Sequence, residues 1–227
     1  MTDRQGGAPP LGRRERKKQE LRNHISGVAT LMFLERGFEA VTVAEIAEAA
    51  DVSAMTVFNY FPRKENLYLD RGPQITELLT TTVRDRGPQE PPLAALRRMV
   101  LRLIDERHPL SGLVEGMGRF LQVVLDSPAL SSRWREMAEE GTAALADVLA
   151  LAAGRTPDDP EVRYAAASVQ TIRDTLTREA ARRTAAGEAV EAIHPGLRLL
   201  AGRLFDSLEG GVGTDWGTAA GAPRPHE

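Results

Sequence analysis

Apolar residues recur every three or four positions along most of the chain, the spacing that places them on one face of an α-helix. Between residues 14 and 36, for example, Leu21, Ile25, Val28 and Met32 follow it. The pattern returns after Pro91, over residues 92–106, 110–126, 128–153, 159–186 and 195–209. These segments are rich in Ala, Leu, Arg and Glu, which lose little freedom in a helix. The pattern predicts an all-α protein.

Two much shorter helices are predicted within residues 42–67, TVAEIAEAADVSAMTVFNYFPRKENL. Thr42 opens the first with a capping box, in which its hydroxyl accepts from the Glu45 amide and the Glu45 side chain reaches back. Ser53 is the N-cap of the second, which ends just before Pro62 because proline disfavours continuation. A helix this short is marginal in water, so packing against the neighbouring helices must hold it in place.

The second short helix displays one side outward. With Val57 at the centre of its buried face, Met55 and Asn59 point almost directly away, and Thr56 and Phe58 lie beside them. A short helix displayed after a tight turn is the helix-turn-helix arrangement, whose second helix enters the major groove of DNA and contacts base edges.

Together with a preceding helix that ends in FLERGFEAV, this stretch resembles the DNA-binding domain of the tetracycline-repressor (TetR/AcrR) family of regulators. The resemblance covers about residues 20–67. It departs at two positions, since Asp51 stands where the family usually has glycine, and Phe58 stands where it often has tyrosine. The resemblance implies an N-terminal three-helix domain that binds DNA and a larger C-terminal helical domain that binds a ligand and dimerises.

The resemblance also implies roles for individual residues. Thr42 and Lys64 are expected to contact phosphates, together with other groups near the short helix. Ala54, Met55 and Thr56 are expected to face the bases, mainly through apolar contact with thymine methyls, and Asn59 can pair with adenine. The full predicted DNA-contacting set is Thr42, Ser53, Ala54, Met55, Thr56, Phe58, Asn59, Tyr60 and Lys64.

The distribution of charge adds a second candidate contact to DNA. The net charge of −3 does not by itself suggest a polyanionic partner. Between Leu11 and His24, however, basic residues outnumber acidic ones. This stretch is interpreted as an arm over the phosphates or in the minor groove, the alternative being a solvated helix end. The arm residues are Arg13, Arg14, Arg16, Lys17 and Lys18.

Four regions are predicted. Residues 1–13 form a disordered arm with a basic end, and residues 14–65 form the helix-turn-helix domain. Residues 66–209 form the ligand-binding and dimerisation domain, and residues 210–227 form a disordered tail that is poor in apolar residues. A fourth helix is expected to start near Arg63 and to be broken at Gly72-Pro73.

A homodimer is expected, because one helix-turn-helix contacts too little DNA for specific binding. The resemblance implies an interface through the helices at 159–186 and 195–209. Each carries an apolar stripe, although both stripes are also compatible with intramolecular core. The stripes consist of Val162, Ala166, Val169, Ile172 and Leu176, and of Leu197, Leu200, Leu204 and Leu208.

The resemblance further implies a cavity for a small-molecule effector in the larger domain. Plain core packing is the alternative for each candidate residue. Arg173, on an otherwise apolar helix face, would suit an anionic head group. The candidates are Met99, Leu103, Met117, Phe120, Leu121, Val124, Trp134, Met137, Gln170, Arg173 and Thr177.

An enzyme is not predicted. The four histidines lie in separate segments, the chain has no cysteine, and no glycine-rich phosphate loop is present. No catalytic residue, metal ligand or cofactor is therefore assigned. No apolar run approaches the roughly 20 residues that cross a bilayer, so a cytoplasmic protein is expected.

The resemblance predicts a ligand-responsive, homodimeric transcriptional repressor. It would bind a (pseudo)palindromic operator and be released by a small molecule. Repression is what most of the resembled family does. The alternative is a helical ligand-binding or scaffold protein whose helix-turn-helix is non-functional, since nothing in residues 92–209 demands DNA.

Overall fold

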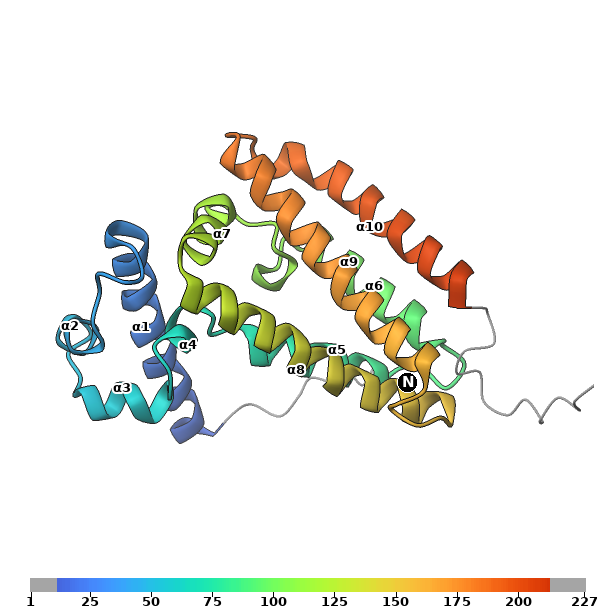
Figure 1. Cartoon of the computed structure of the whole chain (residues 1–227), viewed down its shortest axis with the longest axis horizontal. Helices are drawn as coiled ribbons and strands as arrows, with labels where there is room; N and C mark the ends of the chain where they lie inside the picture. Colours follow the sequence, from blue (N-terminus) through green and yellow to red (C-terminus); the bar gives the residue numbers. More distant parts are fainter. Residues whose placement is uncertain (1–11, 213–227) are drawn as a thin grey trace, which may run out of the picture. The chain divides into compact units, whose positions relative to one another are not determined.

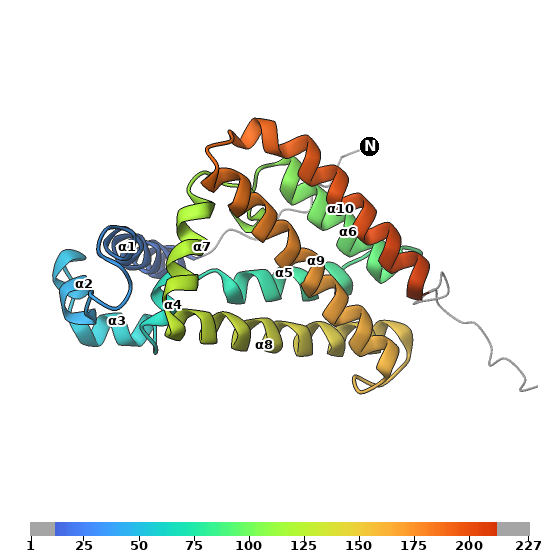
Figure 2. The same ribbon diagram turned by 45° about the horizontal axis from the view of Figure 1, so that its top comes forward.

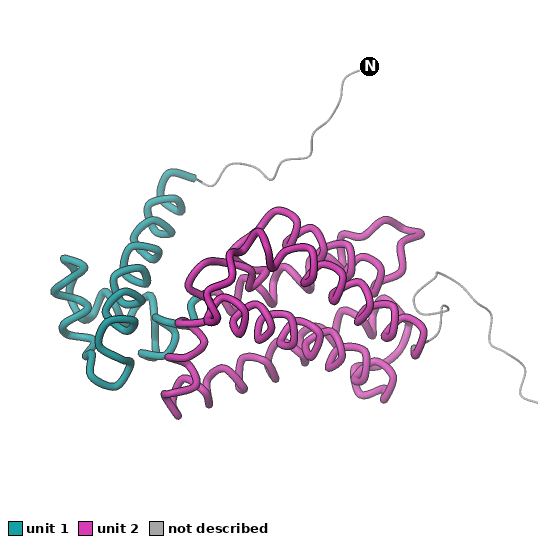
Figure 3. Tube along the Cα trace, turned by 90° about the horizontal axis from the view of Figure 1, so that it is seen from above, with its two compact units in different colours: residues 1–70 teal, residues 71–227 magenta. Residues whose placement is uncertain are grey.

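The computed structural model describes residues 12–212, and all regular secondary structure in this range is helical (Figure 1). The predicted all-α fold is confirmed. The chain divides into two compact units, residues 1–70 and 71–227 (Figure 3). The first unit therefore ends a little beyond residue 65, where sequence patterns placed the boundary.

The first unit is built from four helices. They are α1 (Arg13–Arg36), α2 (Val43–Ala49), α3 (Ala54–Tyr60) and α4 (Glu65–Tyr68). Its core is aromatic: the Phe33 ring centroid lies 4.9 Å from that of Phe38 and 5.7 Å from that of Tyr68, edge to face in the second case. Ile25, Ile46, Val57 and Phe61 are buried around this cluster. The three short helices are thus held against α1 by shared apolar burial.

The second unit contains the longer helices. They are α5 (Gly72–Arg84), α6 (Pro92–Asp105), the 3₁₀ turn η1 (Pro109–Ser111), α7 (Met117–Asp126), α8 (Pro128–Ala153), α9 (Pro160–Ala185) and α10 (Val190–Val212). Helix α9 packs against α7, α8 and α10, while α5 runs beside α8 and α10 beside α6 (Figure 2). Leu96, Val169 and Phe205 are fully buried at the centre of this arrangement.

The prediction of a single helix over residues 110–126 is wrong. The chain forms only a 3₁₀ turn at η1, and the α-helix begins at Met117. Gly112 and Gly116 between them both have φ of +77°, a conformation that interrupts a right-handed helix and that glycine adopts at low cost. The apolar spacing continues through this segment, but the two glycines with positive φ interrupt the helix.

Boundaries in three other parts of the chain also differ from the prediction. Gly72-Pro73 does not break a long fourth helix but starts α5, because proline is well suited to a first turn, where no backbone N–H is needed. Helix α10 begins at Val190 and contains Pro195, and it continues to Val212, so residues 210–212 are helical and not part of a tail. Arg13, placed at the end of the arm, is the first residue of α1. The rest of the predicted arm and tail, residues 1–11 and 213–227, lies outside the described residues.

No helix in the described part of the chain is both long enough and apolar enough to cross a membrane.

Candidate nucleic-acid interface and internal cavity

The start of α2 is fixed by the predicted capping box. The Thr42 hydroxyl accepts from the Glu45 amide at 3.2 Å, and the Thr42 amide donates to the Glu45 carboxylate at 2.8 Å. Arg36 donates to the other carboxylate oxygen at 2.7 Å. The Thr42 hydroxyl donates to the Glu45 carboxylate at 2.7 Å. This bond first, and the bond from the Arg36 guanidinium next, lower the pKa of Glu45 to about 2. The capping box predicted from the sequence is confirmed.

The turn between α2 and α3 depends on one residue in an unusual conformation. Asp51 has φ of +53°, in the left-handed region, and its amide donates to the Glu48 carbonyl at 3.1 Å. The next amide, that of Val52, donates to the Ala47 carbonyl at 2.9 Å. Aspartate tolerates this region better than most residues. The departure from glycine at this position therefore preserves the turn at some cost in strain.

Helix α3 starts at a hydroxyl cap and turns one side to solvent. The Ser53 hydroxyl accepts from the Thr56 amide at 3.0 Å and lies 2.8 Å from the Thr56 hydroxyl. Val57 is fully buried beneath the helix, whereas Met55 is 68% and Phe58 48% exposed. Ala54 and Asn59 are also exposed, and Tyr60 is half-buried. Met55, Phe58 and Asn59 are thus exposed opposite the buried Val57, whereas Thr56 and Tyr60 are half-buried at the flanks.

Arg22 of α1 fastens the end of α3, a role that the sequence reasoning did not assign. Its guanidinium donates to the Tyr60 carbonyl at 2.8 Å and lies 4.3 Å above the centre of the Phe61 ring. A signal for this role is present in the sequence, because Arg22 precedes the buried Ile25 by three residues and so lies on the inward face of α1. Arg22 therefore holds the C-terminal end of α3 against α1.

The Lys64 side chain, predicted to contact a phosphate, makes contacts within the first unit. Its ammonium donates to the Phe38 carbonyl at 2.6 Å and lies 4.2 Å from the centre of the Phe38 ring. Burial lowers the pKa of this lysine. An ammonium group carries three N–H donors, so two remain after the bond to Phe38. Its contact with DNA stays a prediction.

The predicted basic arm residues lie in the first turns of α1. Arg13, Arg14, Arg16, Lys17 and Lys18 are all exposed there. Lys18 lies 3.8 Å from Glu15, one turn away. These residues form a helical basic surface, and the part of the chain before residue 12 is not described.

The apolar stripes considered for dimerisation pack within the chain's own second unit. Val162, Ala166, Val169, Ile172 and Leu176 of α9 are buried in its core, with Leu197 and Leu208 of α10, while Leu200 and Leu204 pack against it. The outer faces of the two helices carry other residues. Tyr164 is 56% and Leu199 61% exposed.

A small cavity lies among α6, η1 and α9. It offers about 10 Å³ to the centre of a water-sized sphere, about enough for one water molecule. The lining residues are Val100, Leu103, Leu110, Ser111, Arg173, Leu176 and Thr177.

Sequence reasoning identified part of this lining. Of the predicted residues, Leu103, Arg173 and Thr177 line the cavity, whereas Val100, Leu110, Ser111 and Leu176 were missed. The other predicted residues are not part of this lining: Met99, Leu121 and Val124 are buried, and Met117, Phe120, Trp134, Met137 and Gln170 are half-buried. The η1 residues were missed because that segment was expected to be a continuous helix.

Arg173 is the one charged residue that lines this cavity. Burial lowers the pKa of its guanidinium to about 10, so it remains protonated at neutral pH. Its Nη1 donates to the Gln170 side-chain oxygen at 3.3 Å.

Comparison with known proteins finds a family match for the helix-turn-helix region. Residues 27–70, which include the whole helix-turn-helix, match the family model of "Bacterial regulatory proteins, tetR family". The chain is 29% identical over 177 residues to the HTH-type transcriptional regulator TcmR of Streptomyces glaucescens, covering 74% of this chain and 76% of TcmR. It is 30% identical over 96 residues to the HTH-type transcriptional regulator RutR of Escherichia coli (strain K12), covering 42% of this chain and 45% of RutR.

The fold itself is also shared with a solved structure. A crystal structure from Mesorhizobium loti MAFF303099, assigned to the TetR family, superposes with a TM-score of 0.54 at 20% identity. The superposition covers 87% of this chain and 97% of that one. The family model, the regulator TcmR and this fold agree with the helix-turn-helix geometry. The helix-turn-helix region thus matches the tetR family of bacterial regulatory proteins, and the chain is similar over about three quarters of its length to a transcriptional regulator.

Proposed function

We propose that the protein is a homodimeric repressor that reads a (pseudo)palindromic operator with α3 and leaves it when a small molecule occupies the second unit. The observation that carries the proposal is the rigid display of α3. Its inner residue Val57 is fully buried, its end is held by Arg22, and Met55 is 68% exposed on the opposite side. A large apolar side chain held in solvent on a short helix suits a role in contacting base edges.

The residues of the interface divide by chemistry. Ala54, Met55 and Thr56 would lie against base edges, with Asn59 as the side chain able to pair bidentately with adenine. Phe58 lacks the hydroxyl of tyrosine, so it would contribute apolar contact only. Phosphate contacts would come from Thr42, Ser53, Tyr60, Lys64 and the basic residues of α1.

The structure constrains how Thr42 would meet a phosphate. Its hydroxyl donates to the Glu45 carboxylate at 2.7 Å and accepts from the Glu45 amide. While that arrangement lasts, the hydroxyl has no hydrogen to give. Thr42 would therefore act mainly through the free backbone N–H groups at the start of α2 that its cap holds in place.

A dimer would form through the outer faces of α9 and α10, because the inner faces are used within the chain. The outer face of α9 carries Tyr164, Thr171 and Arg178 at helical spacing, and that of α10 carries Leu199 and Arg203. Helices α9 and α10 pack side by side (Figure 1). Two copies of this pair would make a four-helix interface and present two α3 helices to successive half-sites.

The test is a fluorescence-anisotropy titration of the full chain with duplex DNA. Duplexes would be selected by the protein from a randomised pool and compared with a scrambled duplex at 50 and 200 mM salt. A dimer that neutralises about 6–10 phosphates should lose roughly 10³–10⁵ in affinity over this range. The selected duplex should bind more tightly than the scrambled one at both salt concentrations.

Matched variants locate the interface. Met55→Ala should change which sequences are selected, whereas Leu151→Ala, at a position 80% exposed in the second unit, should change neither selection nor affinity. If a folded, dimeric chain bound neither duplex at 50 mM salt, the proposal would fail, and the helical ligand-binding protein would become the better interpretation.

A further inference from the structure

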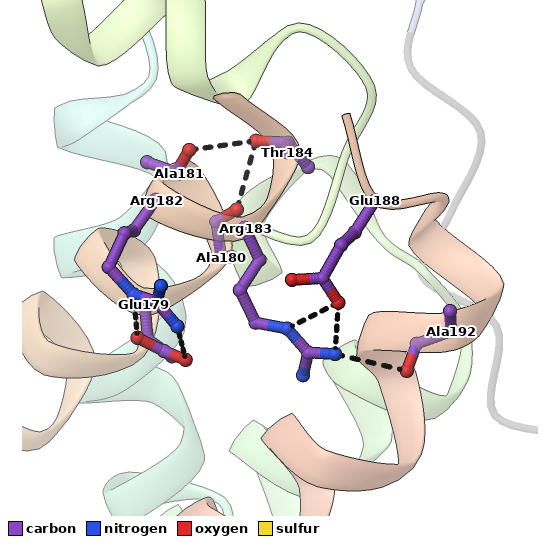
Figure 4. Close-up of polar contacts among 8 residues, drawn as sticks. All are labelled: Glu179, Ala180, Ala181, Arg182, Arg183, Thr184, Glu188 and Ala192. Atoms are coloured by element: carbon purple, nitrogen blue, oxygen red, sulfur yellow. Dashed lines mark hydrogen bonds and ion pairs between the residues drawn. The ribbon is translucent and has the colours of Figure 1, made fainter. Parts of the chain in front are cut away.

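The arginines of α9 are held in two different ways. Figure 4 shows Arg182 paired with Glu179 and Arg183 paired with Glu188 at the end of the helix. The Arg182 bonds are 2.9 and 2.8 Å long and engage both carboxylate oxygens. Arg178 donates to Asp174 at 2.6 Å. These three guanidinium groups are neutralised on the protein surface.

Arg173 is the contrasting case. Within residues 12–212, no carboxylate lies within ion-pair distance of its guanidinium, and its one side-chain partner there is the neutral amide of Gln170. The adjacent carboxylate, that of Asp174, is already bonded to Arg178. Arg173 is half-buried, and a charge removed from water without an ion-pair partner is costly, so a guanidinium in this position points to a role beyond stability.

The surroundings of Arg173 have the composition of a site for an amphiphilic ligand. Two hydroxyl-bearing residues line the cavity with it, and aliphatic residues form the remaining walls. The Ser111 hydroxyl already accepts from the Leu113 amide at 3.0 Å and retains its own hydrogen as a donor. A guanidinium and two hydroxyls beside apolar walls match a ligand with one anionic end and an apolar body.

We propose that this cavity binds an effector with a carboxylate, which pairs with Arg173, and an apolar body, which lies along Val100, Leu103 and Leu110. The inference rests on the proposed function, because it names the chemical class of the molecule that would release the operator. Guanidinium and carboxylate form two parallel hydrogen bonds, which fixes the orientation of the ligand as well as neutralising the charge.

The wall that opens is the segment around η1. The cavity is now large enough for about one water molecule, so a ligand must displace a wall. Gly112 lies so close to α9 that a Cβ there would be 2.9 Å from the Thr177 hydroxyl. Arg107, at the other end of this segment, has φ of +49°, which is strained for a non-glycine residue. Between α6 and α7 the one regular element is the 3₁₀ turn η1, and a short segment of this kind moves more easily than the long helices α6 and α9.

The binding test is isothermal titration calorimetry of the full chain with straight-chain carboxylates from hexanoate to decanoate and with the corresponding primary amides. At least one carboxylate should bind at least about tenfold more tightly than its amide. Arg173→Gln should abolish that preference, and Arg182→Gln, which removes a paired surface arginine of the same helix, should preserve it. Equal binding of acid and amide, or binding of no carboxylate in the series, overturns the inference.

A second measurement does not depend on the choice of ligand. If Arg173 is an uncompensated cation, Arg173→Met should raise the melting temperature of the ligand-free chain, by about 2–4 °C for each kcal/mol gained. Arg182→Met should leave it nearly unchanged. A fall in melting temperature for Arg173→Met would show that the guanidinium stabilises the fold, and the inference would then be wrong.

Titrations of the wild-type chain with DNA distinguish failure of the proposed function from failure of the carboxylate inference. If the ligand-free chain binds no duplex, the proposed function fails whatever the calorimetry shows. If it binds a selected duplex and no carboxylate binds to the chain or displaces the DNA, only the carboxylate inference fails.

Discussion

Buried and half-buried cations are handled differently in the two units. In the first unit, Arg22 and Lys64 each donate to a backbone carbonyl and lie over an aromatic ring. In the second unit, Arg173 lines a cavity, and its side-chain partner among residues 12–212 is the neutral amide of Gln170. The first arrangement is complete without any other molecule, whereas the second leaves a charge to be neutralised. In the proposed function, the first arrangement suits a rigid DNA-binding unit and the second suits a ligand site.

The largest expected effect tests whether the first unit depends on its aromatic core. Phe33→Ala removes a fully buried ring that contacts Phe38 and Tyr68. It should cost about 3–5 kcal/mol in free energy of unfolding, measured by urea denaturation. DNA binding should be lost with it.

Phe205→Ala is the matched control, because Phe205 is an equally buried ring in the second unit. It should destabilise by a similar amount without altering the first unit's own packing. If Phe33→Ala left DNA binding intact under conditions where the chain is folded, α3 would not be held by this core.

The next largest effect is expected from loss of the contacts that Arg22 makes with the end of α3. Arg22→Met keeps an apolar side chain but removes the bond to the Tyr60 carbonyl and the cation above Phe61. Loss of a hydrogen bond from a charged donor should cost about 2 kcal/mol in free energy of unfolding. The control Arg14→Met removes an exposed arginine from the same helix and should change stability by less than about 0.5 kcal/mol. If both variants lost the same free energy of unfolding, Arg22 would not stabilise α3 through these contacts.

Arg22 also illustrates which features could be predicted from sequence. The capping box and the outward face of α3 follow from residues within one or two helical turns, so local spacing was sufficient. The contact between Arg22 and Tyr60 joins residues far apart in the chain, and the local pattern around Arg22 gave it no role. The cavity was harder still, since its η1 wall depends on two glycines with positive φ that apolar periodicity does not register.

A smaller effect of opposite sign is expected at the turn before α3. Asp51→Gly should raise the free energy of unfolding by about 1 kcal/mol, because glycine adopts φ of +53° without steric cost. Asp51→Ala should lower it, since alanine tolerates this region less well than aspartate. Thermal melts of the three proteins would give the order, and identical changes for glycine and alanine would show that backbone strain is not the cause.

The smallest effect concerns the exposed cap of α2 and its dependence on pH. Glu45 has a pKa of about 2 in the folded chain, below its ordinary value of 4.5, because Thr42 and Arg36 bond to the ionised carboxylate. A depressed folded-state pKa stabilises the fold above the unfolded pKa, and this contribution is lost as pH falls from about 4.5 towards about 2.

Glu45→Gln isolates that contribution, because glutamine can still accept the bond from the Thr42 amide but does not titrate. The difference in stability between wild type and variant should therefore be largest near neutral pH and shrink through this acid window. A difference that stayed constant from pH 7 to pH 2 would mean that the charge of Glu45 contributes nothing. The cap would then hold α2 by hydrogen-bond geometry alone.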